Sequence, residues 1–435
     1  MNVLILHRMG DPRYRREAVR ALEYMIPECR SDLNCIVHDA DLPFPDYLKA
    51  VDYHLIVLGP TFLCDRHSPI RLKLTLKEYR FIEHSSACKI ALPQDDYDSS
   101  EILDNWLVQW KMDRVYSVIH GNWDVIYPRY SAIGDIQLGF TGYITKEWID
   151  SWANPKPHEA RDIDVSYRTH SYSQMRCSVR HLKFAIADRF VSKVSRIEGA
   201  ESLELDISSQ SKDLIPGELW HKFIENSRFC LVTPSGSSVL DKTGALRKCV
   251  DRFVRKNPNT SFELVRTACL AGEDRRYILT AISPRNIEAA LAETVQIATP
   301  GSYSGLMQPM EHFIPLEEDC SNIEAVLVLM RNKELVQRIK CACKESILAE
   351  PRLRREVIVD EIITFAQSTL TSRQQSLSIN PRDAQALNQY RAHIDQIAKR
   401  IWQKRQRLQS LRERAIRLGA RQVKQWLLSK FITIS

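Results

Sequence analysis

Two neighbouring carboxylates follow an apolar segment early in the chain, in the sequence PQDDY at residues 93–97. The apolar segment predicts a buried strand over 88–94, so Asp95 and Asp96 stand at its carboxyl end. A carboxylate in such a place can act as a general base toward a hydroxyl group. The alternative is an Asx turn or a cap for the next helix, because aspartate accepts hydrogen bonds from nearby backbone N–H groups. His7, at the end of the first apolar segment, is a third candidate of this kind.

A loop of small residues, TPGSYSG at 299–305, follows another apolar strand. Small residues let backbone N–H groups approach an anion closely, so this loop is a candidate for holding phosphate or sugar oxygens. Its candidate residues are Ser302, Tyr303, Ser304 and Gly305. A plain turn is the alternative, because the loop has neither the G-x-G-x-x-G pattern nor the lysine of a P-loop.

Other chemistries have little support in the sequence. No serine or cysteine stands in a G-x-S-x-G context, so a nucleophilic triad is not predicted. The eleven cysteines are scattered singly through apolar segments, which favours unpaired thiols in a reducing cytoplasm. Cys341 and Cys343 lie close together, but at this spacing a helix points the two thiols apart. We therefore predict no metal site.

The elements that must position these residues alternate along the first third of the chain. Strands are predicted over 2–7, 34–40, 53–60, 88–94 and 114–119, and helices over 11–27, 70–84 and 99–110. Short apolar strands that alternate with helices are typical of a parallel sheet covered by helices on both faces.

The segment between Trp148 and Asp162 contains two prolines and predicts a linker at 151–162. The alternation then restarts. Further strands are predicted over 162–168, 227–234 and 295–299, and helices over 176–195, 241–255, 284–294 and 321–369. The apolar segments ILTAIS (278–283) and HFIPL (312–316) lie between them. We therefore predict two Rossmann-like α/β domains, residues 1–150 and 163–370, that face each other across a cleft.

The last segment, 371–435, predicts a basic helical extension. From Arg382 to Lys430 it has thirteen Lys or Arg and three acids. The net charge of the whole chain is +7, so the residues outside this segment are slightly acidic. Apolar residues recur at heptad spacing at Leu387, Tyr390, Ile394, Ile397, Ile401, Leu408, Leu411, Ala415 and Leu418. This seam indicates a coiled-coil homo-oligomer, and the charge indicates contact with an anionic membrane. Nucleic acid is disfavoured because no recognised binding fold accompanies the charge.

The stretch from AISPRNIEAALAET to HFIPLEEDCSN, residues 281–322, resembles the donor-binding segment of bacterial group 1 glycosyltransferases with the two-Rossmann GT-B fold. The resemblance is to a branch similar to spore-maturation-protein-type transferases, in which a helix R-x-x-E-A-x-A precedes a strand, a small-residue loop and a histidine-containing segment. Weaker matches lie at 226–244, NSRFCLVTPSGSSVLDKTG, and at 89–97, KIALPQDDY. Together they cover most of residues 1–365, and the extension lies outside them.

The resemblance implies a nucleoside diphosphate sugar as the donor substrate and no permanently bound cofactor. Glu288 matches the family glutamate that accepts hydrogen bonds from the ribose hydroxyls. The family also places basic side chains near the start of the second domain to neutralise the diphosphate, and the candidates here are Arg168, Arg180, Lys183 and Arg285. Many members carry a second glutamate eight positions before the first, where this chain has Thr280, so retention or inversion at the anomeric carbon stays open.

The resulting expectation is a cytoplasmic glycosyltransferase that transfers a sugar to a hydroxyl of a glycan or lipid-linked oligosaccharide. Peripheral contact with the inner face of the membrane would bring the basic extension close to a lipid-linked acceptor. The alternative is an inactive transferase-like scaffold that assembles partners through its coiled coil, and Thr280 is its main support.

Overall fold

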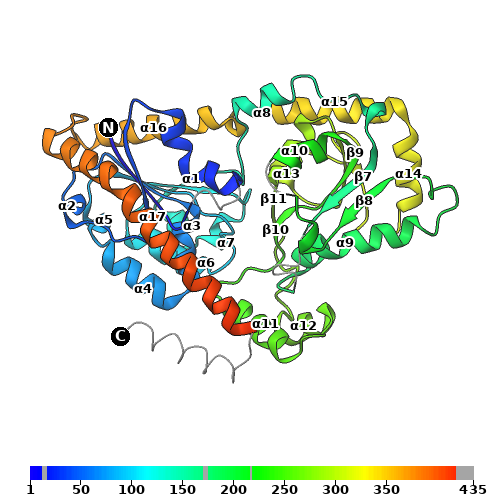
Figure 1. The fold of residues 1–435 in the computed structure, drawn as a ribbon, viewed down its shortest axis with the longest axis horizontal. Coiled ribbons are helices and arrows are strands. Elements are labelled where there is room, and N and C mark those ends of the chain that lie inside the picture. The colour runs from blue at the N-terminus through cyan, green and yellow to red at the C-terminus, as the bar shows by residue number, and fades with distance from the viewer. Residues whose placement is uncertain (12–16, 170–174, 216–217, 418–435) are drawn as a thin grey trace.

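The computed structural model describes residues 1–11, 17–169, 175–215 and 218–417. It contains two separate parallel sheets covered by helices, which lie side by side in Figure 1. The first sheet has six strands in the order β2-β1-β3-β4-β5-β6. These are β1 (Asn2–His7), β2 (Asn34–Asp39), β3 (Leu55–Leu58), β4 (Cys88–Ala91), β5 (Arg114–Ser117) and β6 (Asp135–Leu138).

The second sheet has five strands in the order β13-β12-β9-β7-β8. These are β7 (Ile163–Arg168), β8 (Leu205–Ser208), β9 (Ser227–Val232), β12 (Val295–Ala298) and β13 (Ile314–Pro315). A separate antiparallel pair is formed by β10 (Ser235–Ser237) and β11 (Leu279–Ala281). Numbered within its own domain, each sheet contains the strand order 2-1-3-4-5 of flavodoxin-like, doubly wound folds. The prediction of two Rossmann-like domains is confirmed.

Helices connect and cover these strands. In the first domain they are α1 (Glu17–Cys29), α2 (Asp46–Lys49), α3 (Pro60–Leu63), α4 (Pro69–Glu78), α5 (Phe81–His84), α6 (Ser100–Gln109), α7 (Trp123–Ile126) and α8 (Lys146–Ser151). Later in the chain they are α9 (Ser178–Val194), α10 (Glu218–Glu225), α11 (Ala245–Lys256), α12 (Phe262–Cys269), α13 (Pro284–Leu291), α14 (Ile323–Arg331), α15 (Lys333–Ala349), α16 (Arg355–Ser372) and α17 (Pro381–Arg417).

Continuous apolar segments form the central strands because both faces of each sheet are covered. All six residues of β1 are buried, and Leu4 pairs with Ile36 of β2 on one side and with Ile56 of β3 on the other. The sequence did not predict β6 or β8, whose half-buried segments DIQL and LDIS carry a weak apolar signal. The predicted start of the first helix falls at 12–16, outside the described residues.

Helix α16 follows the second domain in sequence but lies against the first sheet. Arg30 of the first domain pairs with Asp360 of α16 at 3.2 Å, and the Tyr116 hydroxyl donates to Glu361 at 3.0 Å. The chain therefore crosses between the domains twice, once near residue 151 and once before α16.

Helix α17 lies across the first domain beside the edge strand β2 (Figure 1). Leu387 and Tyr390 of the predicted seam are buried, and the Tyr390 hydroxyl is 2.6 Å from Nδ1 of His38. Arg391 donates to the carbonyl oxygen of Cys35 at 3.0 Å. The start of the seam thus packs on the protein's own first domain and is not available to a second copy. Its end at Leu418 lies outside the described residues.

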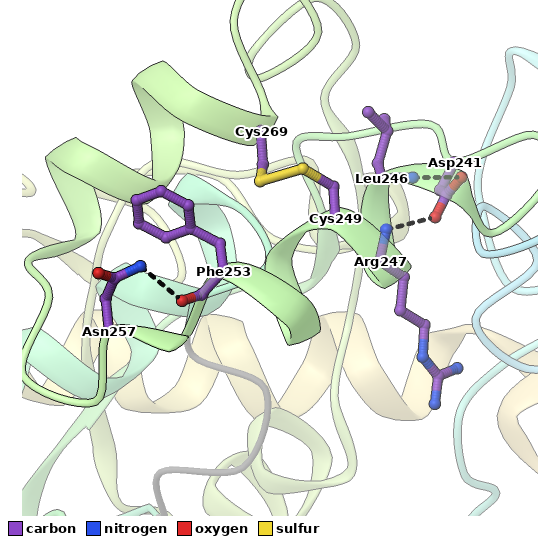
Figure 2. Close-up of a disulfide and its surroundings, with 7 residues drawn as sticks. All are labelled: Asp241, Leu246, Arg247, Cys249, Phe253, Asn257 and Cys269. Atoms are coloured by element: carbon purple, nitrogen blue, oxygen red, sulfur yellow. Dashed lines mark hydrogen bonds between the residues drawn. A yellow bond between two sulfur atoms is a disulfide. The ribbon is translucent and has the colours of Figure 1, made fainter. Parts of the chain in front are cut away.

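The structure corrects the expectation of unpaired cysteines. Cys249 of α11 and Cys269 of α12 form a disulfide with a Cα–Cα distance of 5.7 Å (Figure 2). The two residues are separated by 20 positions, and only the side-by-side packing of the two helices brings them together. The reducing compartment was inferred from cysteines that were expected to be unpaired, and the disulfide removes this argument for two of them.

Candidate active site

Residues that follow strands of the first sheet contact residues of the second domain. The Thr141 hydroxyl, just after β6, donates to the carbonyl oxygen of Ile282 at 2.8 Å. Arg180 of α9 pairs with Asp98, which follows β4, at 3.1 Å. Open α/β sheets bind ligands at the carboxyl ends of their strands, where the strand order reverses. The reversal lies between β1 and β3 in the first sheet and between β7 and β9 in the second.

Helix α13 is fixed on the second sheet by hydrogen bonds in its first turn. Ser283 caps the helix, and its backbone N–H donates to Oδ1 of Asn286 at 2.9 Å. The Asn286 side chain in turn donates to Gln296 of β12 at 2.8 Å, and Gln296 donates back to the Asn286 carbonyl oxygen at 3.0 Å. Proline at position 284 suits the first turn of a helix. These contacts give the side chains of α13 a fixed position.

Glu288 of α13 is nearly buried, with 8% of the residue exposed. The indole N–H of Trp220, on α10, donates to its Oε2 at 2.7 Å. The structure gives Oε1 no hydrogen-bond partner among the described residues. Burial raises the pKa of Glu288, against the opposing effects of the Trp220 bond and the Arg285 charge. A buried carboxylate with one unused acceptor oxygen is a suitable partner for the hydroxyls of a ligand.

Arg285 lies one helical turn before Glu288 and is stacked between two aromatic rings. Its guanidinium carbon is 4.9 Å from the ring centre of Tyr167 and 5.3 Å from that of Trp220. The same group donates to the carbonyl oxygen of Arg168, the last residue of β7. Arg285 and Glu288 therefore lie together at the edge of the second sheet where its strand order reverses.

The other predicted basic residues are placed differently. The Arg168 side chain turns toward β8, where it pairs with the Asp206 carboxylate and donates to the Asp206 carbonyl oxygen at 2.7 Å. Arg180 already has its ion pair with Asp98. Lys183 is half-buried on α9, and its carbonyl oxygen accepts a bond from the Tyr167 hydroxyl at 2.7 Å. Of the four candidates for the diphosphate, only Arg285 lies beside Glu288.

In the small-residue loop at 299–305, two of the four residues predicted to contact a ligand are buried in the protein. Tyr303 is buried and donates its hydroxyl to the Thr299 carbonyl oxygen at 2.6 Å. The Ser304 hydroxyl is buried and accepts a bond from the Ile282 N–H at 3.1 Å. Ser302 and Gly305 are exposed. Tyr303, Ser304 and Gly305 have φ values of 43°, 54° and 79°, a consecutive left-handed run that turns the loop sharply.

Thr280 anchors this loop to β11. Its hydroxyl oxygen accepts a bond from the Ser302 N–H at 3.2 Å, and the Ser302 hydroxyl donates to the Thr280 carbonyl oxygen at 2.7 Å. The residue that departs from the two-glutamate pattern therefore has a structural task here, which is to hold the loop.

His120, which was not among the candidate residues predicted from the sequence, lies near the small-residue loop. It is exposed three positions after the end of β5, and a side-chain carbon added at Gly305 would lie 3.9 Å from its Cε1 atom. The described structure gives its ring no hydrogen-bond partner. An exposed histidine directly after a buried strand was a signal that could have found it.

The two predicted carboxylate bases differ in access. Asp96 is fully buried, and its Oδ2 accepts bonds from the hydroxyls of Ser117 at 2.6 Å and Tyr127 at 2.8 Å. Burial raises the pKa of Asp96. Asp95 is exposed over 58% of its side chain and accepts a bond from the Tyr97 hydroxyl. Asp96 is therefore not accessible to an acceptor substrate, whereas the side chain of Asp95 is.

His7 is buried at the edge where the first sheet reverses. The Met9 N–H donates to its Nδ1 at 3.3 Å, which requires an unprotonated Nδ1, and burial lowers the pKa of His7 to about 4. Glu23 of α1 is also buried here. The Thr61 N–H donates to its Oε1 at 2.9 Å, whereas Oε2 has no hydrogen-bond partner among the described residues. A neutral buried imidazole is a poor match for the predicted role of a general base that meets a substrate.

Replacing Glu23 with glutamine is expected to change how stability depends on pH. Burial raises the pKa of Glu23 from 4.5 to about 7, against the opposing Thr61 bonds, so the folded protein binds this proton more tightly than the unfolded chain. The corresponding stabilisation is complete below pH 4.5 and is lost as the pH rises through 7. Unfolding by urea should show wild type losing about 3 kcal/mol relative to the variant across that range. Parallel pH profiles would contradict this assignment.

Within the described ranges, no group of three or more His, Cys, Asp or Glu side chains is placed to hold a metal ion. Among the same residues, none of the helices combines the length and the apolar composition that crossing a bilayer requires.

No family model and no curated protein sequence matches the chain. Solved structures with a similar arrangement include HepE of Anabaena in complex with UDP-glucose, at 11% identity and a TM-score of 0.47, covering 85% of this chain and 100% of that one. Sucrose-phosphate synthase of Thermosynechococcus elongatus has 10% identity and a TM-score of 0.47, covering 86% of this chain and 100% of that one.

Proposed function

We propose that this chain is a glycosyltransferase that moves a sugar from a nucleoside diphosphate sugar to a hydroxyl acceptor. The observation that carries the proposal is the placement of Glu288, Trp220 and Arg285 at the reversal point of the second sheet. A buried carboxylate with an unused oxygen suits the ribose diol, and an arginine suits a phosphate.

The proposed mechanism depends on charge that develops when the sugar leaves the diphosphate. Positive charge at Arg285 and the N–H groups of the loop around Gly305 would stabilise that charge without rearranging during the reaction. Since residues of both domains meet at this edge, the bound donor would be enclosed and shielded from water, which favours transfer over hydrolysis.

A mixture of sugar nucleotides and candidate glycan acceptors tests this proposal directly. Release of a nucleoside diphosphate together with a lengthened glycan is expected. A protein that binds nucleotides but never turns over would support the scaffold alternative, which the Thr280 position favours. A protein that binds no sugar nucleotide would refute the proposal.

His120 is proposed to contact the transferred sugar from the first domain, because it faces the loop at Gly305. Its replacement with alanine is expected to lower turnover by about 10- to 100-fold, the effect of losing one hydrogen bond to the reacting group. Binding of the nucleoside diphosphate should not change. The matched control is His393→Ala, at an exposed histidine of α17. Equal turnover in the two variants would exclude His120 from the site.

The proposed acceptor is a glycan or a lipid-linked oligosaccharide, reached by contact of α17 with an anionic membrane. Lys399, Arg400 and Arg407 are exposed on this helix. Binding to vesicles that contain anionic lipid should weaken as salt is added, whereas neutral vesicles should bind little. Equal binding to both kinds of vesicle would contradict the membrane role. Pairing of two copies through the remaining seam stays a prediction.

A further inference from the structure

A cavity of about 340 Å³ opens at the amino-terminal edge of the first sheet, opposite the edge that carries the candidate active site. Its lining includes three cationic residues, Lys89 of β4, Lys111 and Arg373, and one acidic residue, Glu83. The polar segment 84–86 completes the wall. A cavity of this size and composition has room for a small polar molecule.

Lys89 is the unusual member of this lining. Strands covered on both faces are normally apolar, and Lys89 stands between the buried residues Cys88 and Ile90 with only 3% of its surface exposed. In the part of the chain that the structure describes, its ammonium group donates one hydrogen bond, to the Ile82 carbonyl oxygen at a long 3.4 Å. A buried ammonium group is costly unless a negative charge accompanies it, and burial lowers the pKa of Lys89 although Asp113 opposes that effect.

The nearby carboxylates do not balance the three cations. Asp113 pairs with the guanidinium of Arg373 and accepts the backbone N–H of Lys89 at 2.8 Å, so its oxygens are engaged. Glu83 accepts a weak bond from Gln109 at 3.4 Å. One of the three positive charges is left over after both carboxylates are counted. The site therefore has an excess of one positive charge, which a bound anion would balance.

We propose that this cavity binds a small phosphate-bearing anion, held by Lys89, Lys111 and Arg373, at a site separate from the candidate active site. Lysine binds phosphate as a point charge, and Arg373 adds a guanidinium whose Nη1 and Nη2 also donate to Asp113. Arg373 also donates to the carbonyl oxygens of Ser86 and Ala87, so the guanidinium is already oriented at the wall. Since Arg373 directly follows α16, the bound anion would also fasten the end of that helix to β4.

Calorimetric titration of the full chain with inorganic phosphate, pyrophosphate and glycerol phosphate tests this proposal. Saturable binding is expected, with affinity falling as sodium chloride is added. Lys89→Met keeps the apolar stem and removes the charge, and it should weaken binding by about tenfold or more. Lys111→Gln changes an exposed residue and should weaken binding without affecting the fold.

One control separates this site from general surface charge. Lys73→Met, at an exposed lysine of α4, should bind as wild type does. Tighter binding of inorganic phosphate or of the ester would identify the source of the anion, and either supports the site. No saturable binding of any probe, or equal affinity in Lys111→Gln, Lys89→Met and wild type, would overturn the proposal.

Discussion

Replacing Glu288 with alanine is expected to weaken binding of a nucleoside diphosphate by about 100-fold. Two hydrogen bonds from ribose hydroxyls to a carboxylate are lost, each worth about 1.5 to 3 kcal/mol, and not all of that sum survives in the net affinity. Glu288→Gln should lose less, about tenfold, because an amide oxygen still accepts one bond without the charge. Titration calorimetry with uridine and guanosine diphosphates measures both variants.

The stability of the same variants distinguishes a binding role from a structural one. Burial raises the pKa of Glu288, so its charge costs folding free energy. Removing the carboxylate takes the hydrogen-bond acceptor from Trp220 and the nearby negative charge from Arg285. The melting temperature of Glu288→Ala should therefore stay equal or rise, as is common for residues kept for function. Glu324→Gln, at an exposed residue of α14, is the matched control. Unchanged nucleotide affinity in Glu288→Ala would remove this residue from the site.

Replacing Asp96 with alanine is expected to lower the free energy of unfolding by about 3 kcal/mol. The hydroxyls of Ser117 and Tyr127 are buried against this carboxylate and would lose their acceptor. A buried polar group left without a partner costs about 1 to 3 kcal/mol. Urea unfolding monitored by circular dichroism measures the difference.

Asp96→Asn separates a structural role from a catalytic one. The asparagine oxygen can still accept a hydroxyl, so stability and turnover should both stay near those of wild type. A general base would behave differently, because its loss typically costs about 100-fold or more in turnover. A large loss of turnover in a stably folded Asp96→Asn protein would restore the catalytic interpretation that the sequence first suggested. Asp95→Asn tests the other predicted general base in the same way, since the side chain of Asp95 is accessible.

Local sequence signals were enough for most of the elements. The apolar segment NVLILH predicted β1, and the helix predicted over 284–294 is α13. Short half-buried strands such as β8 were not predicted, because four residues are too few to show the alternation of apolar and polar residues that marks a strand.

By itself, the sequence determined the two alternating α/β halves, the basic extension and the place of Glu288 and Arg285 on one helix, since each depends on residues close together in the chain. Only the tertiary structure decided which distant groups meet. Trp220 reaches Glu288 across 68 positions, and Tyr390 reaches His38 across 352. It also buried Asp96, brought His120 to Gly305 and joined Cys249 to Cys269. Such contacts follow from the strand order and the packing of helices on the sheets, which no local pattern of residue types specifies.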